Sequence, residues 1–214
     1  QSQAELNEAL DKEKHLNEIK SRFVSMASHE FRTPLSTVLS SASLLTKYTL
    51  TDEQDKRDRH IGKIKGSVKH LNEILEDFLS LGKLDEGKVQ TQITEFNLQE
   101  CIIDIVDEMN VLIKKDQLVE QKYEGSAIVW SDKKLLRNII LNLLSNAIKF
   151  SSEGDKIRLH VSVLKDRVLI IVDDKGIGIS EADQQHLFSS FFRAANATNI
   201  QGTGLGLHIV KRYT

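Results

Sequence analysis

Two kinds of hydrophobic spacing divide the chain into a helical first part and a mixed second part. The spacing predicts one long helix over residues 1–46, whose first 20 residues are charged with loosely spaced aliphatic residues, as in a coiled-coil lead-in. After a polar segment at 49–59, a second helix carries apolar residues at alternating intervals of three and four, which is the seam of a coiled coil. These residues are Ile61, Ile64, Val68, Leu71, Leu75 and Phe78. Because one hairpin buries such a seam poorly, we expect two copies of the chain to pair as a four-helix bundle.

The hydrophobic pattern changes after residue 92. It predicts a helix over 98–112, a strand over 127–130, and a helix that is capped by Ser131 or Asp132 and ends near Phe150. Two β-rich runs, 157–164 and 167–173, are expected to form a hairpin. Residues 180–204 are polar and irregular apart from 187–192, and a last helix begins near Leu205. A loop of this length inside a compact domain is usually functional or mobile.

Length and composition suit two domains, because the chain has 214 residues and 40% of them are hydrophobic. We predict a helical hairpin over 1–84 with the lead-in at 1–20, a linker over 85–92, and a second domain over 93–214. The single cysteine, Cys101, excludes an internal disulfide and fits an apolar helical pattern as a core thiol.

Charge and hydropathy exclude some partners. The net charge is -2, from 29 basic and 31 acidic residues, and no basic run is present, so we expect no nucleic acid partner. The longest aliphatic run, 168–172, is too short to span a bilayer, and we expect no signal peptide. We therefore expect a cytoplasmic fragment, without membrane contact of its own, of a longer protein whose anchoring the sequence leaves open.

His29 lies on a distinctive face of the first helix. At about 100° per residue, the helix places it on the side away from the apolar stripe of Leu35, Val38, Ala42 and Leu45. The same count places it among small polar residues, which are Thr33, Ser36, Ser40 and Ser43. The adjacent Glu30 can fix the tautomer of the ring and make its other nitrogen a better nucleophile. Taken alone, such a histidine is more often a plain surface residue, which is our interpretation of His15, His60, His70, His160, His186 and His208.

The helix that ends near Phe150 presents Asn142, Asn146 and Lys149 on one face. Amide oxygens suit Mg²⁺, which is a hard cation, and lysine brings positive charge to phosphates. Taken alone, this pattern is more often a solvated helix face.

Two glycine-rich segments follow that helix. Asp174 ends an apolar strand and precedes Gly176 and Gly178, so that its carboxylate can accept a hydrogen bond from an adenine amine while the glycines let a flat ring approach. An ordinary β-turn explains the same residues equally well. Residues 202–206 precede a helix start, where backbone N–H groups bind anions, although they lack the preceding strand of a dinucleotide fingerprint and the lysine of a P-loop. Arg193, between these two segments, could reach a terminal phosphate.

In this order, the motifs resemble the catalytic core of the sensor histidine kinases of two-component signalling. Residues 28–34 resemble the H box, 142–150 the N box, 174–178 the G1 box, 187–193 the F box and 202–207 the G2 box. The resemblance covers nearly the whole chain. It implies fold class α plus α/β, in which an antiparallel helical hairpin forms a dimeric four-helix bundle and is followed by a two-layer α/β sandwich of the Bergerat ATP-binding type.

The chain departs from the family pattern at two places. The F box commonly has Glu-Pro where this chain has Ser189-Ser190. The family's sandwich usually continues past the G2 helix with two more strands, so we expect the domain at 93–214 to be truncated at its C-terminus.

The resemblance implies an ATP-dependent protein-histidine kinase that phosphorylates itself on His29. It passes the phosphoryl group to an aspartate of a response regulator receiver domain and also dephosphorylates that regulator. The catalytic residues would be the nucleophile His29, the base Glu30, and Thr33, which positions water for dephosphorylation. ATP and Mg²⁺ would be bound by residues of the other motifs, with Asn142 as the metal ligand. They are Asn142, Asn146, Lys149, Asp174, Gly176, Gly178, Arg193, Gly202, Gly204 and Gly206.

Two alternatives belong to other classes. The first is a regulator-binding phosphatase or scaffold with little kinase activity, which the intact nucleotide motifs disfavour. The second is a related ATPase of the chaperone or mismatch-repair type, which would have no need of the helix that carries His29.

Overall fold

The computed structural model describes residues 2–85, 91–197, 200 and 202–214. The chain forms two compact units, Gln1–Ser80 and Leu81–Thr214. The middle of the predicted linker over 85–92, namely residues 86–90, lies outside the described residues. The domain boundaries at 84 and 93 therefore stay predictions.

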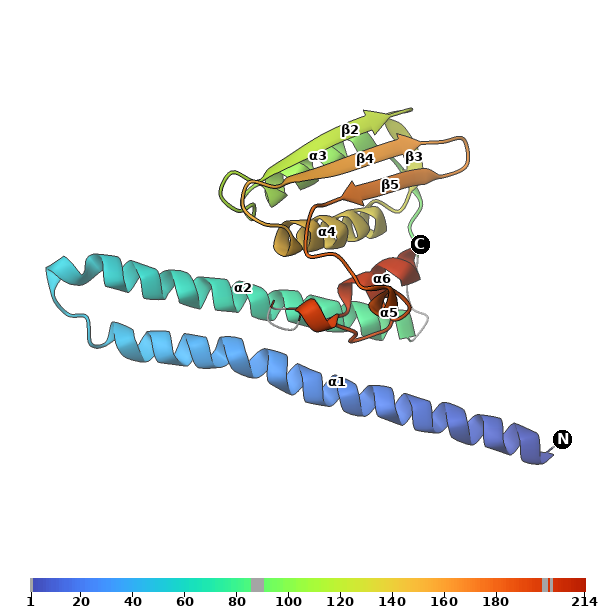
Figure 1. Cartoon of the computed structure of the whole chain (residues 1–214), viewed down its shortest axis with the longest axis horizontal. Helices are drawn as coiled ribbons and strands as arrows, with labels where there is room; N and C mark the ends of the chain where they lie inside the picture. The colour runs from blue at the N-terminus through green and yellow to red at the C-terminus, as the bar shows by residue number, and fades with distance from the viewer. Residues whose placement is uncertain (1, 86–90, 198–199, 201) are drawn as a thin grey trace. The chain divides into compact units, whose positions relative to one another are not determined.

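The first unit is a helical hairpin (Figure 1). Its helices are α1 (Ser2–Leu45) and α2 (Gln54–Asp85), and the 3-10 turn η1 (Thr51–Glu53) lies between them. Arg57 of α2 fastens this connection, because its Nη1 donates to the carbonyl oxygens of Tyr48 at 2.9 Å and Leu50 at 2.7 Å. The predicted long helix over 1–46 is confirmed, whereas the turn is shorter than the polar segment at 49–59.

Aromatic rings pack inside the hairpin. The rings of Phe31 and Phe78 have centroids 5.9 Å apart. Pro34, which lies inside α1, is buried. Near the turn, the ring of His60 stacks on Tyr48 with centroids 5.6 Å apart. His60 is only 9% exposed, so its interpretation as a surface histidine was wrong. The contact with Tyr48 thus covers the His60 ring from the connection between α1 and α2.

The hairpin leaves part of its apolar surface uncovered. The predicted stripe on α1 is split, because Val38 and Leu45 are half-buried while Leu35 and Ala42 are exposed. One partner helix covers only part of the surface of each helix, so several large aliphatic side chains remain partly exposed to solvent. These are Leu35, Leu39, Ile61, Val68, Leu75 and Leu79.

The second unit contains two small sheets. In the first, β1 (Thr94–Asn97) pairs antiparallel with β3 (Ile128–Ser131). In the second, the strand order is β2 (Leu118–Glu124), β4 (Lys156–Val163) and β5 (Val168–Asp173). β2 runs parallel to β4, and β4 and β5 form the predicted antiparallel hairpin.

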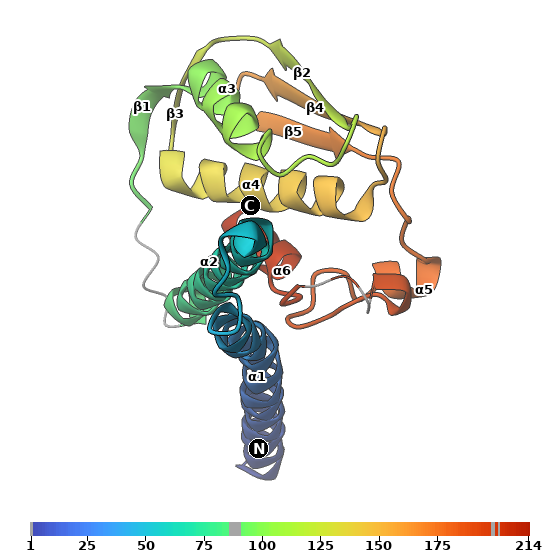
Figure 2. The ribbon, with the colours of Figure 1, turned by 90° about the vertical axis from the view of Figure 1, so that its left-hand side faces the viewer.

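Two helices, α3 (Leu98–Met109) and α4 (Lys133–Phe150), cover one face of the three-stranded sheet (Figure 2). Alternate residues of β4, namely Ile157, Leu159 and Val161, point into this core and are almost fully buried. Cys101 of α3 is buried there as predicted, and burial raises the pKa of its thiol. The structure thus combines a helical hairpin with a mixed α/β domain.

The end of α3 differs from the prediction, because this helix ends at Met109 rather than at 112. Residues 187–192 form turns rather than a regular element. The regular pieces of the loop are α5 (Glu181–Gln184) and η2 (Ala195–Ala197), and α6 (Gly206–Tyr213) follows. Phe191 in this stretch is buried and has a φ of 63°, which lies outside the right-handed helical region. Among the described helices, none combines the length and the apolar character needed to cross a membrane.

Candidate functional site

His29 projects from α1 into solvent, and its side chain is 75% exposed. Its Nδ1 lies 3.4 Å from Oε1 of Glu30, whose side chain is 9% exposed. A buried carboxylate beside Nδ1 favours the tautomer with the proton on that nitrogen. The lone pair of Nε2 is then free to act as a nucleophile.

The small polar residues around His29 are exposed, as predicted from the helical count: Thr33, Ser36, Ser40 and Ser43. Several hydroxyls on this part of α1 bond to carbonyl oxygens one turn back, as those of Ser43 and Thr37 do at 2.9 and 3.1 Å. The hydroxyl of Thr33 makes no such bond to any residue that the structure describes, and this exposed residue lies one turn after His29.

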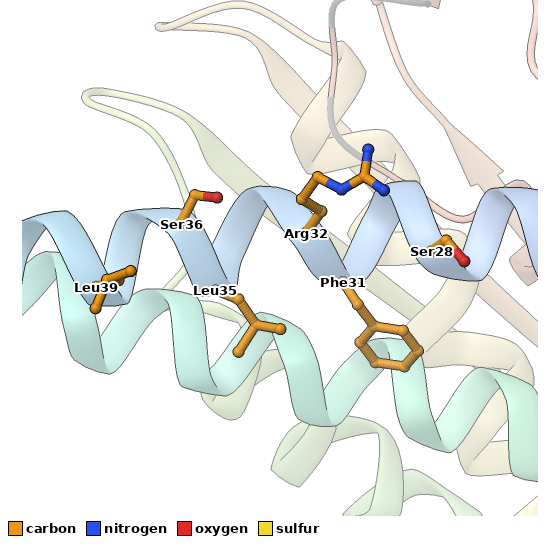
Figure 3. A pocket seen from close by; sticks show the side chains of 6 residues that line it. All are labelled: Ser28, Phe31, Arg32, Leu35, Ser36 and Leu39. Carbon is orange, nitrogen blue, oxygen red and sulfur yellow. The ribbon is translucent and has the colours of Figure 1, made fainter.

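A shallow groove runs along α1 between Ser28 and Leu39 (Figure 3). In Figure 3, Phe31 and Leu35 point toward α2, whereas Arg32 and Ser36 point to the opposite side. The groove thus offers apolar and polar contacts within one turn of the histidine. The full lining consists of Ser28, Phe31, Arg32, Leu35, Ser36 and Leu39.

In the second unit, Asp132 fixes the start of α4. Its Oδ1 accepts hydrogen bonds from the backbone N–H groups of Lys134 and Leu135 at 2.9 and 3.0 Å, and its Oδ2 accepts from Gln92 at 2.7 Å. Burial alone would raise the pKa of this carboxyl, but the three backbone donors outweigh it and lower the pKa. Asp132 was one of the two residues predicted to cap this helix.

The polar residues of α4 meet Gly202, which precedes α6, and Gly206, which begins it. A Cβ added to Gly206 would lie 2.6 Å from Oδ1 of Asn142, and one added to Gly202 would lie 2.6 Å from Nζ of Lys149. Asn146, between the two α4 residues on the same face, is half-buried. These short distances show that the two predicted elements lie together, although the flexible end of Lys149 could shift away from a side chain at position 202.

Asn142 is oriented for binding through oxygen. Its Nδ2 donates to the carbonyl oxygen of Asn138 at 3.0 Å, and its Oδ1 lies toward Gly206. Lys149 has its ammonium 5.3 Å from the ring centroid of Phe150. An amide oxygen and an ammonium group on one helix face are the types of donor that a magnesium ion and phosphates require.

The turn after β5 is attached to the end of α4. Asp174 accepts a hydrogen bond from the N–H of Gly176 at 2.8 Å, and the N–H of Ile177 donates to the carbonyl oxygen of Phe150 at 3.2 Å. A Cβ added to Gly176 would lie 2.7 Å from that carbonyl oxygen, and Gly178 has a φ of +67°. The side chain of Asp174 is exposed, so one carboxylate oxygen holds the turn and the other is available to a ligand.

The loop between α5 and α6 contacts this turn through Asn196, which sequence reasoning missed. Its Nδ2 lies 3.1 Å from the carbonyl oxygen of Gly178. Arg193 donates to the carbonyl oxygens of Ala197 and Ile200 at 3.0 and 2.5 Å, so it organises the loop itself. Gly204, with a φ of +70°, has no room for a Cβ beside the carbonyl oxygen of Phe192. An asparagine in a polar loop carries no periodic signal that could have identified it.

Comparison with known protein families gives one match in the helical hairpin and another in the mixed α/β domain. Residues 19–87 match the family described as His Kinase A (phospho-acceptor) domain, and residues 131–214 match the Histidine kinase-, DNA gyrase B-, and HSP90-like ATPase family. The chain belongs to the sensor histidine kinases. Residues 131–214 thus represent the ATP-binding domain of this family, and His29 lies inside the matched phosphoacceptor domain.

Two curated sensor kinases are similar over nearly the whole chain. The circadian input-output histidine kinase CikA of Synechococcus elongatus is 34% identical over 97% of this chain, and the autoinducer 2 sensor kinase/phosphatase LuxQ of Vibrio cholerae is 36% identical over 98%. The chain spans only 28% and 25% of the lengths of these relatives. The crystal structure of full-length ShkA in complex with AMPPNP superimposes with a TM-score of 0.62 at 28% identity, covering 87% of this chain and 39% of that one.

Proposed function

We propose that this sensor histidine kinase uses ATP to phosphorylate His29 and then passes the phosphoryl group to an aspartate of a response regulator. The observation that carries this proposal is the pairing of an exposed histidine with a buried carboxylate in the phosphoacceptor part of a chain whose other part is an ATP-binding domain. The matched phosphoacceptor domain disfavours a plain ATPase of the chaperone type.

The chemistry at His29 follows from its tautomer. Nε2 attacks the γ-phosphorus, a nitrogen–phosphorus bond forms, and the bond from phosphorus to the bridging oxygen of ADP breaks. The imidazolium that results carries its proton on Nδ1. Glu30, whose Oε1 lies 3.4 Å from Nδ1, stabilises that cation and accepts the proton.

The nucleotide residues bind and orient rather than react. Asn142 supplies an amide oxygen that suits Mg²⁺, which would neutralise phosphate charge, and Asn146 and Lys149 contact the phosphates. Asp174 accepts a hydrogen bond from the adenine amine in a pocket shaped by Gly176 and Gly178. The glycines at 202, 204 and 206 bring backbone N–H groups to the phosphates. Arg193 would reach the terminal phosphate only by exchanging its carbonyl partners within the loop.

A second copy of the chain is the partner proposed for the uncovered apolar side of the hairpin. Leu39 is 70% exposed and Leu79 is 54% exposed, which is costly for aliphatic side chains unless another helix pair covers them. Two hairpins would bury these residues in a four-helix bundle. The exposed strip of small residues next to His29 would then remain open to the receiver domain of a regulator.

Dephosphorylation of the regulator is a second activity that one observation favours. Thr33 is exposed and its hydroxyl has no partner among the described residues, so it can hold a water molecule against a phospho-aspartate. The relative LuxQ is itself named a kinase/phosphatase. This activity would coexist with the kinase or, in the alternative, dominate it.

Incubation of the intact chain with γ-labelled ATP and Mg²⁺, in the absence of any regulator, separates these alternatives. A kinase becomes labelled, and the label is lost in acid and kept in alkali, as for a phosphoramidate. A chain that binds ATP but takes up no label would be a phosphatase or scaffold.

A further inference from the structure

The C-terminal end of α4 is held by a side-chain clamp formed by Lys114 and Gln117, which precede β2. The Nζ of Lys114 donates to the carbonyl oxygens of Lys149, at 2.9 Å, and Ser151. The Nε2 of Gln117 lies 3.2 Å from the carbonyl oxygen of Ile148 and 3.3 Å from that of Ser152. Figure 2 shows the connection between α3 and β2 passing beside this end of α4.

The clamp has the chemistry that a helix end requires. The last carbonyls of a helix lack partners within the helix and carry partial negative charge, which an ammonium group stabilises. Gln117 is 1% exposed, and its Oε1 accepts a hydrogen bond from the N–H of Lys114 at 3.0 Å, which fixes the direction of its amide. The clamp is therefore a built arrangement, partly buried at Lys114 and fully buried at Gln117, rather than a chance surface contact.

The same turn of α4 carries two parts of the nucleotide site. Lys149 contributes its ammonium, and the carbonyl oxygen of Phe150 holds the N–H of Ile177 at 3.2 Å. The clamped carbonyls of Ile148, Lys149 and Ser151 flank that of Phe150 on both sides. A shift of this turn would therefore move the phosphate contact and the turn that begins at Asp174 together.

We propose that Lys114, with Gln117, is a positioning residue of the ATP site, which sets the last turn of α4 so that Lys149 and the Asp174–Gly178 turn face the same nucleotide. This inference rests on the proposed ATP site. It does not require contact between Lys114 and the nucleotide.

The test is Lys114→Met, which keeps the aliphatic stem and removes the donors, with Lys115→Met as the matched control because the Lys115 side chain is exposed. Titrations of the intact chain followed by NMR measure the affinity for ATP with Mg²⁺ and for adenosine. We expect Lys114→Met to weaken the affinity for both ligands at least about five-fold, which corresponds to the lower end of typical coupling free energies. Lys115→Met should bind as the parent does, and Lys114→Arg should recover part of the loss.

The affinity for adenosine, which has no phosphates, distinguishes a positioning role of Lys114 from a direct effect of its charge on the phosphates. A loss confined to ATP would mean that the charge of Lys114 acts on the phosphates directly, and unchanged binding of both ligands would mean that the clamp has no role; either result overturns the proposal. If the parent itself fails to bind ATP, the proposed function fails first. If Lys114→Met does not fold, Lys114→Gln takes its place, with an affinity below that of the parent as the expected result and parent-like affinity as the contrary one.

Discussion

His29 and Glu30 show how two adjacent side chains divide a task on one helix. The carboxylate is buried and the imidazole is exposed, so the hydrogen bond between them leaves only one ring nitrogen open to a substrate. Most polar residues of both sites could be predicted, because each follows a periodic or glycine-marked pattern. Asn196 and Lys114 could not, because their partners are carbonyl oxygens far along the chain.

Asp174→Asn should weaken ATP binding sharply. The amide oxygen of asparagine can still accept from Gly176, but its NH₂ group would face the adenine amine with a donor. Loss of a charge-assisted hydrogen bond of about 1.5–3 kcal/mol corresponds to a roughly ten- to hundred-fold weaker affinity by calorimetry. The control is Asp173→Asn, since Asp173 is an exposed carboxylate paired with Arg158. Equal affinities of Asp174→Asn and the parent would place the adenine elsewhere.

Thr33→Ala separates the two proposed activities. It should keep labelling by ATP and lose most dephosphorylation of a purified phospho-regulator, because the hydroxyl lies one turn beyond the attacking nitrogen. Ser40→Ala, on the same exposed strip but farther along, should change neither rate. If Thr33→Ala dephosphorylates the regulator as fast as the parent, Thr33 has no part in that reaction.

At the scale of elements, periodic helices and apolar strands were predictable, and elements held by pairing alone were not. β4 and β5 alternate clearly in burial, and α4 has both a stripe and a cap. β2 was missed because only Val119 and Tyr123 of its seven residues are even half-buried. Its parallel pairing with β4, rather than its own side chains, makes it a strand.

The Asp132 cap should stabilise the second unit in a pH-dependent way. Asp132→Ala leaves three backbone donors without their acceptor and should lower the free energy of unfolding by about 1–2 kcal/mol at neutral pH. The pKa of this carboxyl is lower in the folded state, so its contribution is present above about pH 4 and is lost as the pH falls through the folded pKa.

Urea unfolding at pH 7 and at pH 3 measures this effect. The difference in free energy of unfolding between the parent and Asp132→Ala should be smaller at the lower pH. Asp132→Asn, which retains a capping oxygen, should keep most of the stability of the parent at neutral pH. A difference in free energy of unfolding that grows on acidification would contradict the assigned direction of the pKa shift.

At the scale of the whole molecule, the order of the motifs carried the functional prediction. A histidine helix followed by an ATP-binding domain is the order that the family comparison confirms. The exposed seam predicts that a second copy completes the molecule, since a lone hairpin leaves Val68 and Leu75 nearly half exposed. The clamp at the end of α4 has no counterpart in any sequence pattern, because it joins residues about 35 positions apart.

The location of the phosphoryl group tests the central claim most directly. After reaction with ATP and Mg²⁺, trypsin digestion under alkaline conditions releases the peptide 23–32, which contains His29 together with Ser25 and Ser28. Fragmentation by mass spectrometry should place the phosphoryl group on His29, and His29→Gln should bind ATP with the affinity of the parent but take up no label. A phosphoryl group on another residue of the parent, or label retained by His29→Gln, would contradict the account.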